Sequence, residues 1–338
     1  MDICYLLAFP DSGDGGATPP EQFKGLIKDA PYFQPVDIDL VTLGDETVVI
    51  EGFAVSVMRH RYDDRVQMVE CRFDLPNPFA ASVLQARIKI QNALQSRYIP
   101  EVHRRSAMFE EYSILLVQEA KPTPDKWIDK NAFTIANFIR SQREVFDKEE
   151  VGDVLSSRTR YSAEELTLID WEGAVIIAPK ADFRSDIALL KIGNYQLLRY
   201  RMLDQTIEEM LDKISETFFQ NKRRPRPTRG MIRQIAEHRL EVMLGFERAE
   251  QNMLLIGDWY TAKLYEAIQR EFYLTDWKES VRSKLDNLEN IVQTIKDNFT
   301  LSWENLMDRL QLFGWVLLLV GYIYLYLLDV GWIKISIP

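Results

Sequence analysis

The stretch LQLFGWVLLLVGYIYLYLL occupies residues 310–328 and contains no charged side chain. At roughly 1.5 Å per residue, a helix of this length is about 28 Å long, close to the hydrocarbon thickness of a bilayer. Tyrosines crowd its second half, where amphipathic rings favour the headgroup layer. We therefore expect one transmembrane helix. A helix buried in the core of the protein is the alternative reading of so apolar a segment.

The tail after this segment, residues 329–338, is too short for a second span. At the other end, MDICYLLAFPDSG lacks the basic start and the long apolar stretch of a signal peptide. These features predict a tail-anchored, single-pass membrane protein. The bulk of the chain is expected in the cytoplasm or in an organelle matrix.

Residues 276–309, directly before the apolar segment, carry apolar side chains at intervals of four and three, the rhythm of a coiled coil. The stripe consists of Val281, Leu285, Leu288, Val292, Ile295, Phe299 and Leu306. The membrane segment continues the stripe and adds two glycines: Phe313, Gly314, Val316, Val320, Gly321, Ile323 and Leu327. Either earlier helices of the same chain or further copies of the chain cover the stripe. The second reading predicts a homo-oligomer with a coiled-coil stalk.

Residues 185–272 show the helical period almost throughout, and both prolines of this range fall in NKRRPRPTRG, residues 221–230. Proline does not continue a helix, so we expect this segment to be the turn of an antiparallel helical hairpin. Five basic side chains gather in the turn: Lys222, Arg223, Arg224, Arg226 and Arg229. They are candidates for contact with anionic lipid headgroups or a partner. A turn that is only solvated is the simpler reading.

Residues 1–180 are rich in Val, Ile, Tyr and Phe between turn residues. This composition indicates strands at 3–9, 36–43, 47–60, 66–73 and 112–117, with helices at about 78–98 and 125–147. Residues 165–179 read as a strand pair or as one strand bent near Glu172 and Gly173. The pattern predicts an α+β domain with a mixed or antiparallel sheet.

Few features of the sequence point to chemistry. The net charge of −10 argues against a DNA partner, and two cysteines with three scattered histidines form no zinc pattern. The loop GDGG at 13–16 lacks the spacing and the lysine of a nucleotide-binding loop. Asp170 and Glu172 flank Trp171, and strand alternation would place both carboxylates on one solvent-facing side. With no catalytic constellation recognised, we predict a protein that is not an enzyme.

Three segments ahead of the terminal apolar helix carry a family resemblance: YSAEELTLIDWEGAVIIAP (161–179), NYQLLRYRMLDQTIEEML (194–211) and EFYLTDWKESVRSKLDNLENIVQTIKDNFTLSWENLMDRLQ (271–311). Their order resembles the Rmd1 family, also called DUF155, over about residues 160–330. This resemblance implies a membrane-anchored factor of mitochondria or bacteria, in some members tied to translation at the inner membrane, with no known enzyme activity.

The architecture is also similar to that of the CorA-type magnesium channels, in which a soluble domain and long helices precede the membrane. That likeness implies oligomerisation through the stalk. The Gly-Met-Asn signature of those channels is replaced here by GYIYLY (321–326), and no second span follows.

The sequence thus favours a homo-oligomeric, non-enzymatic scaffold or sensor that presents its α+β domain at a membrane. One alternative is a CorA-like oligomeric channel or pore-forming effector, although the apolar stripe would make a dry pore lining. The other is a membrane effector gated by a nucleotide ligand, for which the loop at 13–16 is the supporting feature.

Overall fold

The computed structural model describes residues 1–11, 21–22, 39–142, 147–216 and 259–329, with single helical positions between 233 and 244. Side chains at 21–22, 39, 81–82, 295–306, 324 and 328–329 are outside this description. So are the loop at 13–16 and the basic residues Lys222, Arg223, Arg224, Arg226 and Arg229. The chain divides into two compact units. Unit 1 comprises Met1–Thr206 and Val242–Ser283, and unit 2 comprises Ile207–Glu241 and Lys284–Pro338.

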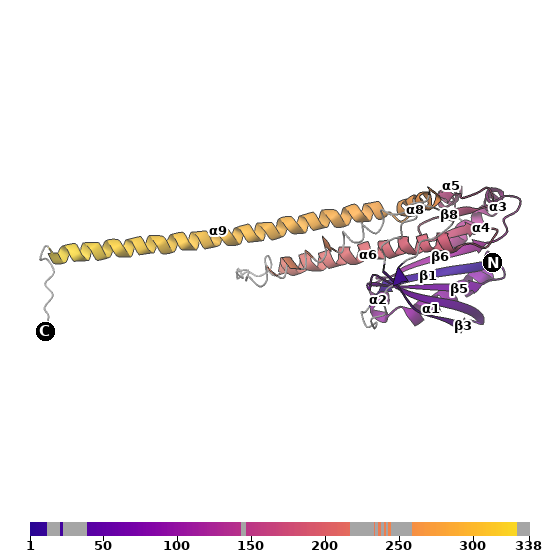
Figure 1. The fold of residues 1–338 in the computed structure, drawn as a ribbon, viewed down its shortest axis with the longest axis horizontal. Coiled ribbons are helices and arrows are strands. Elements are labelled where there is room, and N and C mark those ends of the chain that lie inside the picture. The colour runs from indigo at the N-terminus through magenta and orange to yellow at the C-terminus, as the bar shows by residue number, and fades with distance from the viewer. Residues whose placement is uncertain are drawn as a thin grey trace. The chain divides into compact units, whose positions relative to one another are not determined.

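One mixed sheet organises unit 1 (Figure 1). Its strands are β1 (Asp2–Pro10), β2 (Glu21–Gln22), β3 (Asp39–Ile50), β4 (Phe53–Tyr62), β5 (Val66–Asp74), β6 (Glu110–Val117), β7 (Arg158–Thr159), β8 (Leu166–Ile169) and β9 (Gly173–Ile177). Among the described residues they are ordered β2-β3-β4-β5-β1-β6-β9-β8-β7. Neighbouring strands are antiparallel except β6 and β9, which are parallel. The expected mixed sheet is therefore confirmed.

Two of the expected strand segments contain turns. Residues 47–60 form the end of β3 and most of β4, joined by a tight turn at Glu51 and Gly52, whose φ angles are 51° and 82°. Glycine adopts such a positive φ without strain, which makes the reversal possible at this point. Residues 165–179 form the antiparallel pair β8 and β9, the first of the two readings of that segment.

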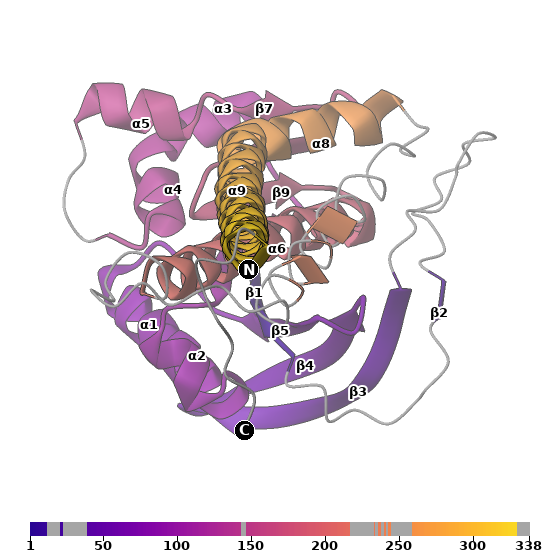
Figure 2. The same cartoon turned by 90° about the vertical axis from the view of Figure 1, so that its left-hand side faces the viewer.

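Helices cover both faces of the sheet. They are α1 (Ala81–Tyr98), α2 (Glu101–Arg105), α3 (Pro124–Lys130), α4 (Ala132–Ile139), α5 (Lys148–Val154), α6 (Arg184–Ser215), α8 (Trp259–Glu271) and α9 (Leu274–Asp329). On one face, Tyr5 and Leu7 of β1 share a hydrophobic core with Ile90 and Leu94 of α1. On the other face, Lys191 of α6 pairs with Glu70 of β5. Figure 2 shows α1 and α6 on opposite sides of β1 and β5.

The middle of α6 is buried on all sides, from residue 191 to residue 200. Several polar side chains in this stretch bind neighbours. Burial alone would raise the pKa of Glu70, but Lys191 and Arg72 together outweigh it and hold the pKa below its usual range. On the side facing α8, the Tyr265 hydroxyl donates a hydrogen bond of 2.6 Å to Gln196 Oε1.

A glycine sets the distance between α6 and α8. A Cβ atom on Gly193 would lie 2.5 Å from Ile268 Cγ2 and 3.1 Å from a ring carbon of Phe272. These contacts are closer than van der Waals distance, so any side chain at Gly193 would force the two helices apart. Gly193 therefore fixes the position of Phe272, the residue between α8 and the start of α9.

The first positions of the predicted stalk stripe are covered by the chain itself. In unit 1, Val281 is fully buried. In unit 2, Leu285 and Leu288 are buried, and Lys284 Nζ forms an ion pair of 2.7 Å with Glu208 of α6. Val292 is half-buried, whereas the side chains of Ile295, Phe299 and Leu306 are not described. Pairing of the later stripe with another copy of the chain stays a prediction.

One helix among the described residues is long and apolar enough to cross a membrane. It is Met307–Leu327 within α9, with a mean hydropathy of 1.8 and no part buried against the protein. Its apolar side chains are exposed, for example 65% at Phe313 and 61% at Leu319. A Cβ atom on Gly314 or Gly321 would meet no atom within 4 Å, so the backbone there is open to close approach.

Candidate functional site: a polar pocket at the edge of β6

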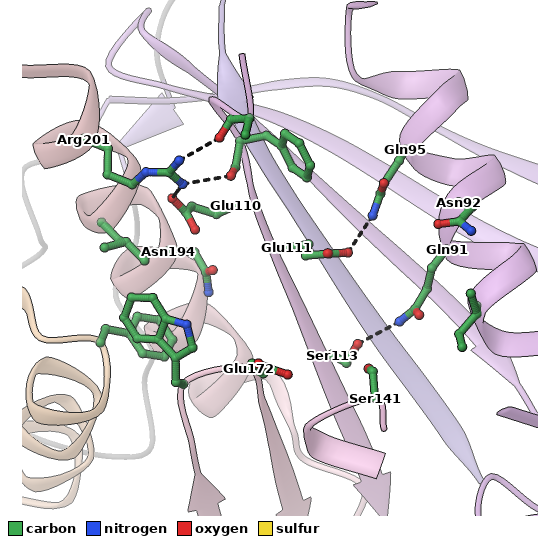
Figure 3. Close-up of a pocket in the computed structure, with 16 residues that line it drawn as sticks. Gln91, Asn92, Gln95, Glu110, Glu111, Ser113, Ser141, Glu172, Asn194 and Arg201 are labelled. Atoms are coloured by element: carbon green, nitrogen blue, oxygen red, sulfur yellow. Dashed lines mark hydrogen bonds and ion pairs between the residues drawn. The ribbon is translucent and has the colours of Figure 1, made fainter. Parts of the chain in front are cut away.

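A missing strand neighbour creates the site. β6 begins at Glu110, but its pairing with β9 begins only at Ser113, opposite Gly173. The start of β6 pairs with β1 on its other edge. A cavity of about 630 Å³ lies along the part of β6 that does not pair with β9, entirely within unit 1. Its lining comes from α1, β6, the residue Ser141 after α4, the β8–β9 turn, α6 and the end of α8 (Figure 3).

Gly173 follows the lining residue Glu172 and starts β9 beside Ser113 of β6. A Cβ atom at this position would lie 2.7 Å from the carbonyl oxygen of Ser113 and 3.4 Å from that of Ile139. Only glycine permits β9 to start so close to β6.

Two glutamines of α1 form one wall. Gln91 Nε2 donates a hydrogen bond of 2.8 Å to Ser113 Oγ, and Gln95 Nε2 donates one of 2.6 Å to Glu111 Oε2. Tyr5 also donates to Glu111 through its hydroxyl. Burial, followed by the charge of Glu111, raises the pKa of Tyr5 well above its ordinary value. The hydroxyl therefore stays protonated and remains a donor.

The opposite wall belongs to α6. Arg201 pairs with Glu110 and donates hydrogen bonds of 3.1 Å to the Phe109 carbonyl and 2.7 Å to the Ala107 carbonyl. Burial raises the pKa of Glu110, and Arg201 opposes that rise. Asn194, nearly two helical turns before Arg201, is only 3% exposed and donates a hydrogen bond of 2.8 Å to the Leu190 carbonyl.

The β8–β9 turn corrects one expectation from the sequence. Asp170 and Glu172 do not share a solvent-facing side of a strand, because both belong to the turn closed by the hydrogen bond from Asp170 N to Gly173 O at 2.9 Å. Asp170 is buried and bound by Arg140, whose Nε lies 2.9 Å from its Oδ2. Glu172 instead lines the pocket. Turn geometry, rather than strand alternation, sends these two carboxylates in different directions.

The Glu172 carboxylate has no hydrogen bond or ion pair within the described part of the chain. Burial raises its pKa, and Arg140 opposes that rise. The carboxylates of Asp170 and Glu111 act in the same direction as burial. Burial and the neighbouring acids therefore disfavour the charged form of Glu172, and a cation in the cavity would favour it.

The junction between α8 and α9 closes the pocket. Phe272 packs against Trp171 of the turn with 6.3 Å between ring centroids, and against Tyr112 of β6 with 5.1 Å. Tyr273 lies 5.7 Å from Trp171 and adopts a φ of 49°, and α9 begins at the next residue. The pocket wall and the start of the longest helix are therefore joined through two aromatic side chains.

A buried cation lies behind the lining. Arg87 of α1 is 1% exposed, and its guanidinium sits 4.2 Å above the Phe138 ring and donates 2.9 Å to Ser141 Oγ. Burial lowers its pKa to about 10. Arg87 therefore reaches the pocket through the Ser141 hydroxyl.

The thiols and metal-binding side chains lie apart from the pocket. Cys4 and Cys71 are free and buried in the sheet, and burial raises the pKa of both thiols. Within the ranges that the structure describes, no group of three or more His, Cys, Asp or Glu side chains is arranged to hold a metal ion.

Most of the lining was missed by sequence reasoning. Gln91, Gln95 and Asn194 are polar residues within helices, where such side chains usually face solvent. The sequence of α6 does contain a signal for a buried polar residue. Its apolar residues extend over more than one stripe, so that a polar residue such as Asn194 had to be buried.

Comparison with known proteins gives a partial match. A family model described as the N-terminal domain of the uncharacterized protein MJ0711 matches residues 30–184. The uncharacterized protein MJ0711 of Methanocaldococcus jannaschii is 23% identical over 197 residues, 56% of this chain and 59% of that protein. No solved structure matches this chain. These matches do not support the resemblances to the Rmd1 family or to the CorA-type channels. What they show is that unit 1, from before β3 to the start of α6, is similar to the MJ0711 N-terminal domain.

Proposed function

We propose that this protein is a membrane-anchored, non-enzymatic sensor. In this account unit 1 binds a small ligand in the β6 pocket, and the apolar end of α9 fixes the protein in a bilayer. The bulk of the chain lies on the cytoplasmic or matrix side.

The observation that carries the proposal is the shared wall between the pocket and the start of α9. Phe272 lines the pocket, and α9 begins two residues later and continues as one helix to Asp329. A ligand that pushes on Phe272 or Trp171 therefore acts directly on the first turn of the helix that carries the apolar segment. Helices transmit such displacements because their backbone is stiff along the axis.

The chemistry of the pocket favours binding over catalysis. Ser113 accepts a hydrogen bond from the Gln91 amide, which does not take up a proton at neutral pH. A serine hydroxyl needs a neighbouring base to become a nucleophile. Glu110 is neutralised by Arg201, and Glu111 accepts from two neutral donors. These groups are arranged to hold polar atoms in fixed positions.

Association of the membrane helices is part of the proposal. Gly314 and Gly321 are seven residues apart, so they lie on one side of the helix, and their backbone is open to contact. The mass of the purified chain in several mild detergents should correspond to an oligomer, and Gly314→Leu with Gly321→Leu should lower it. A monomer in every detergent would show that the chain does not self-associate. It would not affect the proposal that the apolar helix anchors the protein in a membrane.

The sensing step can be tested before a ligand is known. Asn92 lines the pocket from α1, and Asn92→Trp would fill part of the cavity from the side opposite α6. We expect hydrogen exchange of the backbone amides in the first turns of α9, residues 274–283, to change in this variant. Lys89→Trp is the matched control, because Lys89 is an exposed α1 residue that does not line the pocket. Equal exchange in wild type and Asn92→Trp, with the fold intact, would show that the pocket and α9 are uncoupled.

A further inference from the structure

The pocket carries unbalanced negative charge. Three of its lining residues are glutamates, whereas Arg201 is the one basic residue in the described lining. Arg201 is already engaged by Glu110 and by two backbone carbonyls. Two carboxylates, Glu111 and Glu172, are therefore left without a basic partner among the described residues. A cavity with such a lining attracts cations and repels anions.

The nearby cations do not neutralise these two carboxylates. Arg140 donates a hydrogen bond of 3.2 Å to Asp170 and lies 3.8 Å from Glu150. On Glu172 it acts through its charge, which opposes the rise in pKa without cancelling it. Arg87 reaches the lining only through Ser141. Neither guanidinium group forms an ion pair with Glu111 or Glu172 among the described residues.

Two buried amides add unused acceptors. Asn194 Nδ2 donates a hydrogen bond to the Leu190 carbonyl, and Gln91 Nε2 donates one to Ser113 Oγ. Their side chains are 3% and 7% exposed, and neither amide oxygen accepts a hydrogen bond from a described residue. Figure 3 shows Asn194 and Gln91 on opposite sides of the cavity. Because both residues line the cavity, their amide oxygens can accept hydrogen bonds from a ligand that brings N–H groups.

An aromatic surface completes the lining. Trp171 is 38% exposed, and it stands next to Glu172 in the same turn. Indole faces attract ammonium groups through the ring quadrupole. A carboxylate beside an indole is a combination that holds an organic ammonium ion by charge and by its attached methylene groups.

The volume of the cavity favours an organic cation over a bare metal ion as its ligand. At about 630 Å³ it falls in the range of small-molecule pockets, roughly 300–1,000 Å³. Two carboxylates without a basic partner among the described residues, Glu111 and Glu172, also match two positive charges on one molecule.

We propose that this pocket binds a small aliphatic diamine or polyamine, with its ammonium groups on Glu172 and Glu111 and one of them against Trp171. The inference rests on the proposed function and names the class of ligand that the sensor would detect.

Isothermal titration of the full chain in lipid nanodiscs with putrescine tests this assignment. We expect one saturable site per chain. Glu172→Gln, which keeps shape and removes charge, should weaken binding at least tenfold, and Trp171→Leu should weaken it as well. The matched control is Glu119→Gln, because Glu119 is an exposed carboxylate paired with Lys121 outside the pocket. That control should bind putrescine like the wild type, and unfolding curves should show that all variants remain folded.

Several results would overturn the assignment. These are absence of putrescine and spermidine binding, equal loss in the Glu119 control, displacement by Mg²⁺ at equal ionic strength, or preferential binding of succinate. None of these results bears on the coupling of the pocket to α9, because the Asn92→Trp exchange measurement uses no ligand. The class of ligand and the sensing function therefore fail separately.

Discussion

Glu70, Lys191 and His60 bring titratable groups together between the sheet and α6. The ion pair of Glu70 with Lys191 is nearly inaccessible to solvent, with side-chain exposures of 7% and 10%. His60 lies on β4 beside this pair, 3.4 Å from the Thr42 hydroxyl. Burial lowers the pKa of His60 to about 4, and the charge of Lys191 acts in the same direction. The imidazole is therefore neutral in the folded protein at physiological pH.

His60 makes the stability of unit 1 depend on pH. In the unfolded chain His60 titrates near its ordinary pKa of about 6.5, whereas the folded pKa is about 4. Between these values the unfolded state binds the extra proton, so the free energy of unfolding falls as the pH is lowered through this window. We expect the wild type to lose about 1 to 2 kcal/mol more than His60→Gln between pH 7 and pH 4.5.

Urea unfolding of both proteins at a series of pH values measures this difference. Plotted against pH, the free energies of unfolding of wild type and His60→Gln should run parallel above pH 7 and diverge below it. Parallel curves throughout the acid range would mean that His60 is protonated equally in both states, and that its burial does not govern the titration.

Among the elements, the close contact between α6 and α8 determines where α9 starts. Gly193→Val would place methyl groups where Ile268 and Phe272 now lie. We expect a loss of about 1 to 3 kcal/mol in unfolding free energy, which is typical of overpacking. The emission of Trp171 should also change, because Phe272 packs against it.

Gly152→Ala is the control for this prediction. Gly152 is an exposed glycine of α5, and a Cβ atom there would meet nothing within 4 Å. Alanine should stabilise this helix by up to about 1 kcal/mol. If Gly193→Val also stabilised the protein, the gain in helix propensity would exceed the cost of the steric overlap. The claim that α6 and α8 pack tightly at Gly193 would then be wrong.

Leu288 of α9 tests what covers the stalk stripe. It is fully buried in the single chain, so Leu288→Asp should cost unit 2 about 3 kcal/mol or more. Hydrogen exchange at residues 207–215 of α6 should accelerate, whereas Leu288→Met should change it little. If Leu288→Asp instead dissociated an oligomer and left this exchange unchanged, the stripe would be a contact between copies.

The strands and the apolar helix could be predicted from the sequence because their signals are local. The runs at 66–73 and 112–117 correspond to β5 and β6, and the uncharged segment at 310–328 lies in α9 and overlaps the apolar range Met307–Leu327. The pocket could not be predicted, because Gln91, Ser113, Asn194 and Phe272 come together only through packing of α1 and α6 on the sheet. Trp171 and Glu172 were noticed in the sequence, but the turn that directs Glu172 depends on the register of β8 with β9.

The whole molecule combines a polar pocket in unit 1 with an exposed apolar helix at the end of α9. The described side chains of Met307–Tyr326 are exposed, and so much apolar surface is unfavourable in water. Lipid would cover it. The sensor proposal and the expected cytoplasmic or matrix orientation both depend on this step.

Alkaline carbonate extraction of membranes that contain the full-length chain tests this step most directly. The wild type should stay in the membrane pellet. The double variant Leu318→Arg with Val320→Arg should move toward the soluble fraction, because each central arginine costs roughly 2.5 to 3.5 kcal/mol in a membrane helix. If the intact wild-type chain were instead found in the aqueous fraction without detergent, as a single monodisperse species, the apolar end of α9 would not be in lipid, and the account of a membrane-anchored sensor would be wrong.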